Sequence, residues 1–457
     1  MHLISSPFDK FFKRLSSGGM LLMLVTLVAL IWANSPIKDY YHFVWHHHLS
    51  FSLEPYKLSL SLLHWINDGL MVLFFFVVGL EIKREFLAGE LSSFHQAVFP
   101  VFAAIGGMVV PILLFFSFDL TGDANRGWGI PMATDIAFSL AILSMMGSRV
   151  PLSLKVFLTA LAIVDDLGAI LVIALFYSSH IYWHYLFIAF ILLSILALAN
   201  YYDIQVISLY IGLGIIIWFL FLQSGIHPTI AGVLVALTIP ARNRVNIKYF
   251  APKIKWRLKK FTSLSGSSHS CILTTEQLHA IDDLGNIVER VQSPLQKMEH
   301  RLSGMVNYLI LPLFALSNAG VTILSTAAPL SSITDALTPL SLVIAFSLIF
   351  GKSIGISLFS WLAVKLKLAV KPRNIPWMAF IGLGLIGGIG FTMSLFIANL
   401  AFEAPELQDQ AKIGIFLGSF ISGLAGYLLL KRTLSPNRKN KKTAKHHFSD
   451  EICETNR

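Results

Sequence analysis

The chain has 457 residues, of which 55% are hydrophobic and only 13% are charged. Soluble domains carry about 25% charged residues, so this composition excludes an ordinary soluble enzyme and indicates a membrane protein. The formal net charge of +10 is compatible with a nucleic-acid partner, depending on where the positive residues lie. The two cysteines, Cys271 and Cys453, predict neither a disulfide framework nor a thiolate metal site.

Apolar segments long enough to cross a membrane run through most of the chain. A transmembrane helix needs about 20 mostly apolar residues. Twelve candidates are found, at 18–33, 62–81, 95–117, 127–147, 156–177, 183–200, 205–222, 226–240, 303–324, 339–363, 376–400 and 411–430. The eighth is short, and the fourth and eleventh contain glycine or proline inside the segment. Basic residues precede the first as in a signal peptide, but no clear cleavage site follows, so we expect an uncleaved span.

The positive residues predict the orientation of these spans, because lysine and arginine concentrate in cytoplasmic loops. With the N-terminus inside, all but five of the 35 lysine and arginine residues fall on the cytoplasmic side. The exceptions are Lys38, Lys57, Arg126, Lys412 and the intramembrane Lys352. We therefore predict twelve spans in an inner (plasma) membrane with both termini cytoplasmic. Orientation then accounts for the net charge, and no nucleic-acid partner is needed.

This orientation divides the chain into a cytoplasmic segment at 1–17, a twelve-span domain at 18–431 and a basic cytoplasmic tail at 432–457 that we expect to be disordered. The external loop 34–61 contains two alternating apolar-polar stretches, 49–53 and 56–60, around Glu54 and Pro55. This pattern predicts a β-hairpin, whose open edge would pair with a second copy in a homodimer. The alternative is an extended loop on the membrane surface.

The cytoplasmic loop 241–302 contains a second amphipathic segment. Thr274 and Gln277 form a capping-box pattern. The apolar positions that follow share one helical face: Leu278, Ile281, Leu284, Ile287 and Val291. We predict an amphipathic helix that rests on the lipid membrane or on the protein.

Four charges lie inside the predicted spans: Asp135 in the fourth, Asp165 and Asp166 in the fifth, and Lys352 in the tenth. Each costs about 2.5–3.5 kcal/mol at a bilayer centre, so such residues usually carry function. A purely structural ion pair would explain one aspartate with Lys352, but not a second, adjacent aspartate. Neighbouring helical residues project about 100° apart, so one carboxylate can pair with the lysine while the other faces a cavity. A site that holds either protons or a cation, but not both, is the minimum for antiport.

The fourth and eleventh spans are predicted to be broken. The fourth contains Gly127, Gly129 and Pro131, and the eleventh has five glycines between 382 and 390. Broken helices are tolerated in a membrane only where they line a cavity. Asp135 would offset the positive helix N-termini and Lys352 the negative C-termini. The two broken spans stand seven apart in the order of spans. This is the separation expected if the two halves of the domain repeat in inverted topology.

Several other functions were weighed. The glycines at 382, 384 and 387 match a dinucleotide-binding pattern, but no strand-helix-strand context surrounds them. An intramembrane aspartyl protease needs two carboxylates that face each other, whereas adjacent helical residues point apart. A cation or organic-anion symporter and a channel remain alternatives to an antiporter.

Several motifs closely resemble the NhaA family of bacterial sodium/proton antiporters. They are Ala133-Thr-Asp-Ile-Ala-Phe138, Leu161-Ala-Ile-Val-Asp-Asp-Leu-Gly-Ala169, Gly351-Lys-Ser-Ile-Gly355, Gly390-Phe-Thr-Met-Ser394, Trp65-Ile-Asn-Asp68 and Val78-Gly-Leu-Glu-Ile-Lys-Arg-Glu85. The resemblance covers roughly 10–431. It implies an all-α membrane protein with twelve transmembrane helices, two of them broken and crossing, in inverted-topology repeats.

The resemblance also implies a transport activity without an enzymatic reaction or a cofactor. The expected activity is electrogenic exchange of Na⁺ or Li⁺ against two protons, for sodium extrusion and pH homeostasis. Asp166 and Asp165 would bind the ion, with Thr134 and Asp135 beside them, and Lys352 would pair with Asp165.

A pH-responsive group is implied in the same way. Its members match Glu81, Arg84, Glu85, Glu299 and His300, together with His227. Glu299 and His300 could alternatively lie at the end of a solvated loop without a role in the pH response. Asp68 also matches a family aspartate, and for this residue a structural role is the alternative to a role in transport. Two departures affect the expected pH profile: Ser303 and Gly304 stand where close relatives can carry His-Pro, and the loop 241–302 is longer than in the shortest members.

Overall fold

The computed structural model describes residues 7–53, 56–89, 91–178, 181–242, 281, 292–321, 338–372 and 375–434. In chain order the first elements are α1 (Pro7–Ala33), α2 (Lys38–His46), β1 (His48–Leu53), β2 (Tyr56–Ser61), α3 (Leu62–His64), η1 (Trp65–Leu70), α4 (Met71–Ala88), α5 (Phe94–Phe116), η2 (Gly122–Met132), α6 (Ile136–Met145), η3 (Gly147–Arg149) and α7 (Leu152–Phe176). The next are α8 (Trp183–Tyr201), α9 (Ile207–Ser224), α10 (Thr229–Thr238), α13 (Pro294–Met305), η4 (Val306–Ile310), α14 (Leu311–Asn318), α16 (Pro339–Phe346), η5 (Ser347–Gly351), α17 (Lys352–Lys365), α18 (Trp377–Gly387), α19 (Phe391–Ala401) and α20 (Pro405–Thr433).

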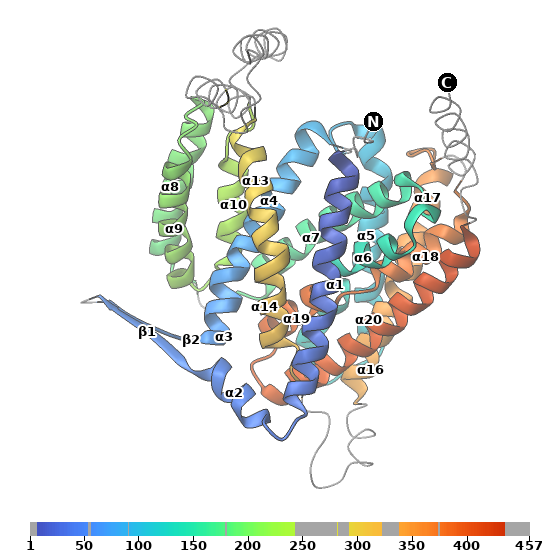
Figure 1. Cartoon of the computed structure of the whole chain (residues 1–457), viewed down its shortest axis with the longest axis horizontal. Coiled ribbons are helices and arrows are strands. Elements are labelled where there is room, and N and C mark those ends of the chain that lie inside the picture. Colours follow the sequence, from blue (N-terminus) through green and yellow to red (C-terminus); the bar gives the residue numbers. More distant parts are fainter. Residues whose placement is uncertain are drawn as a thin grey trace, which may run out of the picture.

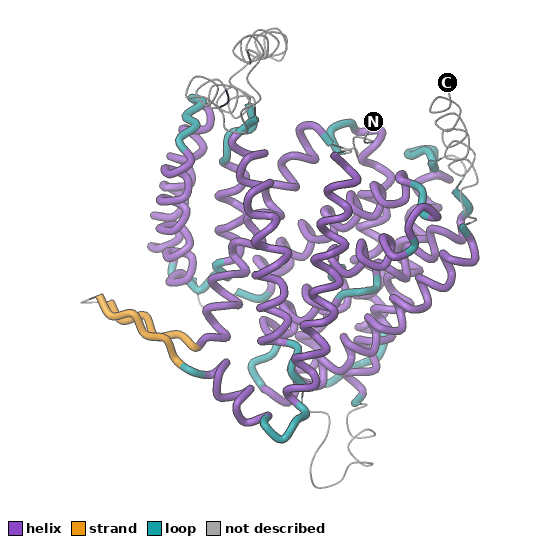
Figure 2. The backbone as a smooth tube through the Cα atoms, viewed as in Figure 1, coloured by secondary structure: helices purple, strands orange, loops and turns teal. Residues whose placement is uncertain are grey.

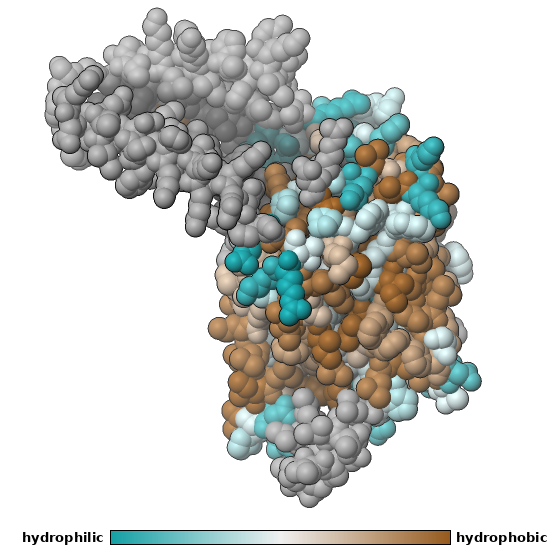
Figure 3. Space-filling model, turned by 90° about the vertical axis from the view of Figure 1, so that its right-hand side faces the viewer, coloured by the Kyte–Doolittle hydropathy of each residue, from teal (hydrophilic) through white to brown (hydrophobic). Residues whose placement is uncertain are grey.

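The helices form one bundle, with α8 and α9 at one side, α16, α17, α18 and α20 at the other, and α19 in the middle (Figure 1). The start of α1 and the end of α20 lie at the same end of the bundle, and the hairpin projects near the opposite end. Apolar side chains cover a continuous zone across the middle of the surface in Figure 3, and hydrophilic ones gather toward its two ends. This distribution is that of a multi-pass membrane protein.

Helices lie at each of the twelve predicted intervals, but fewer pass a test of length and hydropathy. Seven described helices are long and apolar enough to cross a membrane, or ten if each bent pair counts as one span. The two remaining intervals fall on α10, which has 10 residues, and on the α13–η4–α14 run. The fold is therefore a multi-pass helical membrane protein, and the count of twelve stays a prediction.

Two of the predicted spans are bent where glycine and proline indicated a break. The axes of η2 and α6 differ by 46°, and those of α18 and α19 by 45°. Figure 2 shows short non-helical segments inside the body of the bundle. The two breaks contact each other, because the Asp135 N–H donates to the carbonyl of Ile389 at 2.7 Å. The carbonyl of one break thus satisfies a backbone N–H that the other break leaves without a helical partner.

Three π-helical segments, η1, η4 and η5, were not predicted from the sequence. Each lies within a longer helical run, and π-helical turns inside α-helices occur frequently at functional sites. The segment η5 directly precedes Lys352. The close packing of α5 against α17 also places this lysine. A Cβ added at Gly355 would lie 2.1 Å from the Gly106 carbonyl oxygen, so only glycine allows this approach.

The predicted β-hairpin is confirmed. Strands β1 and β2 pair antiparallel, with a register that runs from His48 opposite Ser61 to Leu53 opposite Tyr56. The alternative of an extended surface loop is therefore wrong. The nine-residue helix α2 precedes the hairpin and was not predicted; its Tyr41 and Trp45 are buried.

Two predictions fall on parts of the chain outside the described residues. They are the amphipathic helix of the loop 241–302, of which only Ile281 and the segments at either end are described, and the tail beyond Leu434. The boundaries at 18 and 431 also stay predictions.

Candidate functional site

The buried charges gather where the two bent pairs meet α7 and α17. Asp165 and Lys352 are 1% and 0% exposed, and Lys352 Nζ lies 2.6 Å from Asp165 Oδ2. The same ammonium donates to Thr134 Oγ1 at 2.9 Å. Because a buried ion needs both an opposite charge and hydrogen bonds, these contacts explain how Lys352 is accommodated.

Thr134 links this ion pair to the eleventh predicted span. Its hydroxyl accepts from Lys352 and donates to the carbonyl of Gly387, the last residue of α18, at 2.9 Å. Lys352 therefore reaches the negative C-terminal end of α18 through one hydroxyl group.

Asp135 is shared by the N-termini of two helices. It is the N-cap of α6, where Oδ1 accepts from the Phe138 N–H at 2.9 Å. Its Oδ2 accepts from the Thr392 N–H at 3.0 Å, and from the Thr392 hydroxyl as well. Because Thr392 is the second residue of α19, one carboxylate satisfies donors at two positive helix ends.

Asp166 is placed differently from its neighbour. It is 1% exposed, yet neither of its oxygens, nor Asp165 Oδ1, has a hydrogen-bond partner among the described residues. A buried carboxylate without partners is costly unless it takes up a proton or coordinates a cation. These three oxygens therefore suit a small hard cation, which prefers oxygen ligands.

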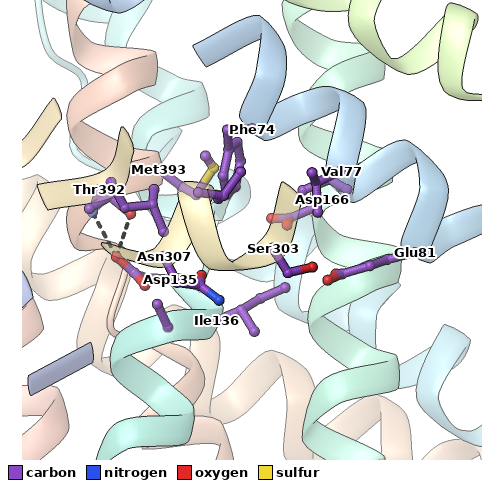
Figure 4. Close-up of a pocket in the computed structure, with 14 residues that line it drawn as sticks. Phe74, Val77, Glu81, Asp135, Ile136, Asp166, Ser303, Asn307, Thr392 and Met393 are labelled. Atoms are coloured by element: carbon purple, nitrogen blue, oxygen red, sulfur yellow. Dashed lines mark hydrogen bonds between the residues drawn. The ribbon is translucent and has the colours of Figure 1, made fainter. Parts of the chain in front are cut away.

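Asp166 opens onto a cavity of about 50 Å³, which is room for a few water molecules. Its lining comes from α4, α6, α7, α13, η4, α14 and α19: Phe74, Val77, Val78, Glu81, Asp135, Ile136, Ala137, Asp166, Ser303, Val306, Asn307, Leu311, Thr392 and Met393. Figure 4 shows Asp135 and Thr392 at one side of this cavity, Asp166 and Glu81 at the other, and Asn307 and Ser303 between them. Asp165, Thr134 and Lys352 lie outside the lining.

Part of the predicted pH-responsive group is brought together beside this cavity. Arg84 forms an ion pair with Glu299 and a second with Glu85 Oε1, whose oxygen lies 2.9 Å from Nη2. Glu81 lines the cavity. Burial raises the pKa of Glu299, and the positive charge of Arg84 opposes that rise.

The two histidines lie apart from this cluster. His300 is exposed, although it follows the buried Glu299 in α13. His227 lies between α9 and α10, and its Nε2 donates to the Tyr177 carbonyl at 2.6 Å. The structure thus separates His227 from the cluster around Arg84.

Sequence reasoning missed three polar residues of the site: Thr392, Ser303 and Asn307. Thr392 is part of the motif Gly390-Phe-Thr-Met-Ser394, so a residue-by-residue search of that motif would have found it. Asn307 lies in the π-helical segment η4, whose altered spacing the sequence pattern does not reveal.

Buried carboxylates, a buried lysine and two helix breaks around one cavity, inside a multi-pass helical body, define the class of membrane ion transporters rather than of enzymes. The chain belongs to the Na⁺/H⁺ antiporter 1 family, whose model matches residues 9–430. The resemblance to the NhaA family drawn from the motifs is thereby confirmed.

Three relatives illustrate the extent of the similarity. The chain is 45% identical to the Na(+)/H(+) antiporter NhaA of Oleidesulfovibrio alaskensis, over 93% of this chain and 94% of that protein. Identity is 46% to NhaA 1 of Saccharophagus degradans, over 94% and 92% respectively. It is also 46% to NhaA of Bacteroides thetaiotaomicron, over 93% and 97%.

Proposed function

We propose that this chain is a secondary transporter that exchanges Na⁺ or Li⁺ for protons across the bacterial inner membrane, for sodium extrusion and pH homeostasis. The observation that carries the proposal is Asp166, a buried carboxylate with two unpartnered oxygens on a cavity, beside the Asp165–Lys352 ion pair. Family membership supports the choice of ions.

Competition at one site accounts for the exchange. The cation binds to the ionised Asp166 and to the free oxygen of Asp165, and protonation of these carboxylates removes its ligands. A cation that draws Asp165 away from Lys352 weakens that ion pair, so the lysine is part of the same titrating group. Exchange of two protons for one cation makes the cycle electrogenic. The coupled groups share these protons, so neither proton belongs to one residue alone.

The finer architecture is part of the proposal. We infer twelve spans with both termini cytoplasmic, inverted-topology repeats, and bent pairs that cross near the bilayer centre. The hydrogen bonds between the two breaks support the crossing. The common end of the bundle at which α1 starts and α20 ends supports the orientation (Figure 1).

Regulation by pH is assigned to the charged residues beside the cavity and to His227. Glu81, Arg84, Glu85 and Glu299 are supported by their contacts beside the cavity. His300 is included through the family resemblance alone.

The decisive test uses everted membrane vesicles with a preformed pH gradient. Adding Na⁺ or Li⁺ dissipates the gradient with the native protein, and Asp166→Asn abolishes this response because it removes the cation's anionic ligand. Asp123→Asn is the matched control, since the Asp123 side chain is 80% exposed in a salt bridge with Arg126. A normal response of the Asp166 variant contradicts the proposal. If Na⁺ entry instead carries protons into the vesicles and acidifies their interior further, the protein is a symporter.

A homodimer formed through the 49–60 hairpin is also proposed. The two-stranded sheet has an open edge on each strand, and edges of this kind pair readily with another chain. Deletion of residues 49–60 is expected to convert the protein from a dimer to a monomer in detergent, as measured by light scattering. An unchanged dimer mass rejects the hairpin as the interface.

A further inference from the structure

The helix α2 carries exposed histidines on a rigid support. Its buried face is fixed by Tyr41, whose hydroxyl donates to the Leu316 carbonyl at 2.7 Å and accepts from the Gly320 N–H at 3.0 Å. His42 and His46 are both exposed on the same helix. These two imidazoles therefore project from a helix that is anchored to the end of α14.

The spacing of the two histidines is that of a chelating pair. Residues four apart are neighbours on a helix surface, and the ring centroids of His42 and His46 lie 6.3 Å apart. One ion between the rings can be reached by both imidazoles, since a metal–nitrogen bond is about 2.0–2.1 Å long.

A hydrogen bond fixes the tautomer of His46. Its Nδ1 lies 2.9 Å from the carbonyl oxygen of His42. Because a carbonyl only accepts, Nδ1 carries the proton, and Nε2 presents a free lone pair to solvent. Histidines that bind metals almost always donate their other ring N–H to a carbonyl or carboxylate in this way.

We propose that His42 and His46 form a binding site for a divalent transition-metal ion of the Ni²⁺, Cu²⁺ and Zn²⁺ class. Imidazole prefers these ions, whereas the carboxylate oxygens around Asp166 prefer hard cations. In the part of the chain that the structure describes, no group of three or more His, Cys, Asp or Glu side chains is placed to hold a metal. The site therefore consists of two protein nitrogens, with water completing the coordination.

The test is a titration of the full-length protein in detergent with NiCl₂, in which isothermal titration calorimetry measures binding. The protein carries an affinity tag without histidine, and His446→Ala and His447→Ala form the background because the tail contains that adjacent pair. One tight Ni²⁺ ion per chain is expected. Since two linked ligands bind far more tightly than one, His42→Ala and His46→Ala are each expected to weaken this site by on the order of 100-fold.

Two variants show whether the effect is specific. His95→Ala removes an exposed histidine near the start of α5 and is expected to leave the affinity unchanged. His47→Ala with His48→Ala tests the neighbouring exposed imidazoles and is expected to have only a small effect.

An independent readout is thermal stability, because an ion that binds only the folded helix raises the unfolding temperature. NiCl₂ is expected to raise Tm in the native protein but not in His42→Ala/His46→Ala, whose metal-free Tm stays unchanged because both rings are exposed. Two results overturn the proposal: absence of a tight site in the background protein, or a tight site that survives the double substitution.

Discussion

The two sides of the buried aspartates are built differently. Toward Glu81 the site opens onto a cavity with polar residues, Ser303 and Asn307, in its wall. Toward the C-terminal end of α19, the ring of Phe396 packs against two other aromatic rings. Its centroid lies 5.4 Å from that of Phe75 and 6.2 Å from that of Phe314. All three rings are at most 2% exposed, so this side of the site is filled.

Beyond the aromatic rings lies a cluster of three amides from separate elements. Asn318 in α14 donates to Asn67 Oδ1 at 2.9 Å, and its own Oδ1 accepts from Asn67 at 3.2 Å and from Asn399 at 2.6 Å. Asn67 and Glu81 lie on one helical run, about 20 Å apart at 1.5 Å per residue. The cavity and the amide cluster are therefore on opposite sides of the aromatic layer.

This difference explains how the site can serve transport. An exchanger needs its ion site open to one side of the membrane at a time. The filled side is held by two kinds of contact, apolar rings next to the site and hydrogen-bonded amides beyond them. Amides can bond to water once they separate, so opening the cluster costs less than exposing an equal apolar surface.

The largest expected effect comes from locking the filled side. In a background without Cys271 and Cys453, Asn318→Cys and Asn399→Cys are linked by a short bifunctional methanethiosulfonate. Exchange is expected to stop and to return when dithiothreitol cleaves the link, because α19 carries Thr392 and with it one wall of the site. The measurement is Na⁺-driven dissipation of a pH gradient in proteoliposomes.

The matched control links Asn67→Cys to Asn318→Cys. These two residues already share two hydrogen bonds, and neither belongs to the bent pair that carries Thr392. This link is expected to preserve exchange. Undiminished exchange by fully linked 318–399 protein would show that the filled side does not open there.

A smaller but still substantial effect is expected at the boundary between the two sides. Lys352→Ala leaves Asp165 without its partner, and breaking a buried ion pair costs about 3–5 kcal/mol while the remaining charge stays ionised. We expect a lower Tm in detergent and a changed charge movement per cycle, measured with and without a valinomycin-clamped potential. Lys365→Ala is the control, since Lys365 is exposed at the end of the same helix beside Trp361. An unaltered Tm and unaltered electrogenicity would remove Lys352 from the coupled group.

The sequence predicted the charged part of this comparison better than the packed part. Apolar length and intramembrane charge mark Asp135, Asp165, Asp166 and Lys352 directly, because each is costly in lipid. Alternation around a turn likewise predicted the hairpin. These are local signals, and each can be read from one segment.

The packed side depends on contacts that no single segment contains. Asn67, Asn318 and Asn399 come from three elements, and an asparagine in an apolar span does not reveal which helix it faces. Similarly, α2 was missed because its nine residues are too short for a strong periodic signal. The π-helical segments change the spacing of side chains without a clear change in composition.

The smallest effect is expected on the cavity side, at Glu299. Burial raises the pKa of this carboxyl above its usual value of about 4.3. A raised folded-state pKa contributes stability below the unfolded-state pKa, and this contribution is lost as pH rises through the folded-state pKa. Glu299→Gln should therefore flatten the fall of Tm with rising pH above about 4.3. Glu406→Gln serves as the control, since Glu406 is exposed in the first turn of α20. An identical pH dependence of Tm in both variants would show that Glu299 does not titrate with folding.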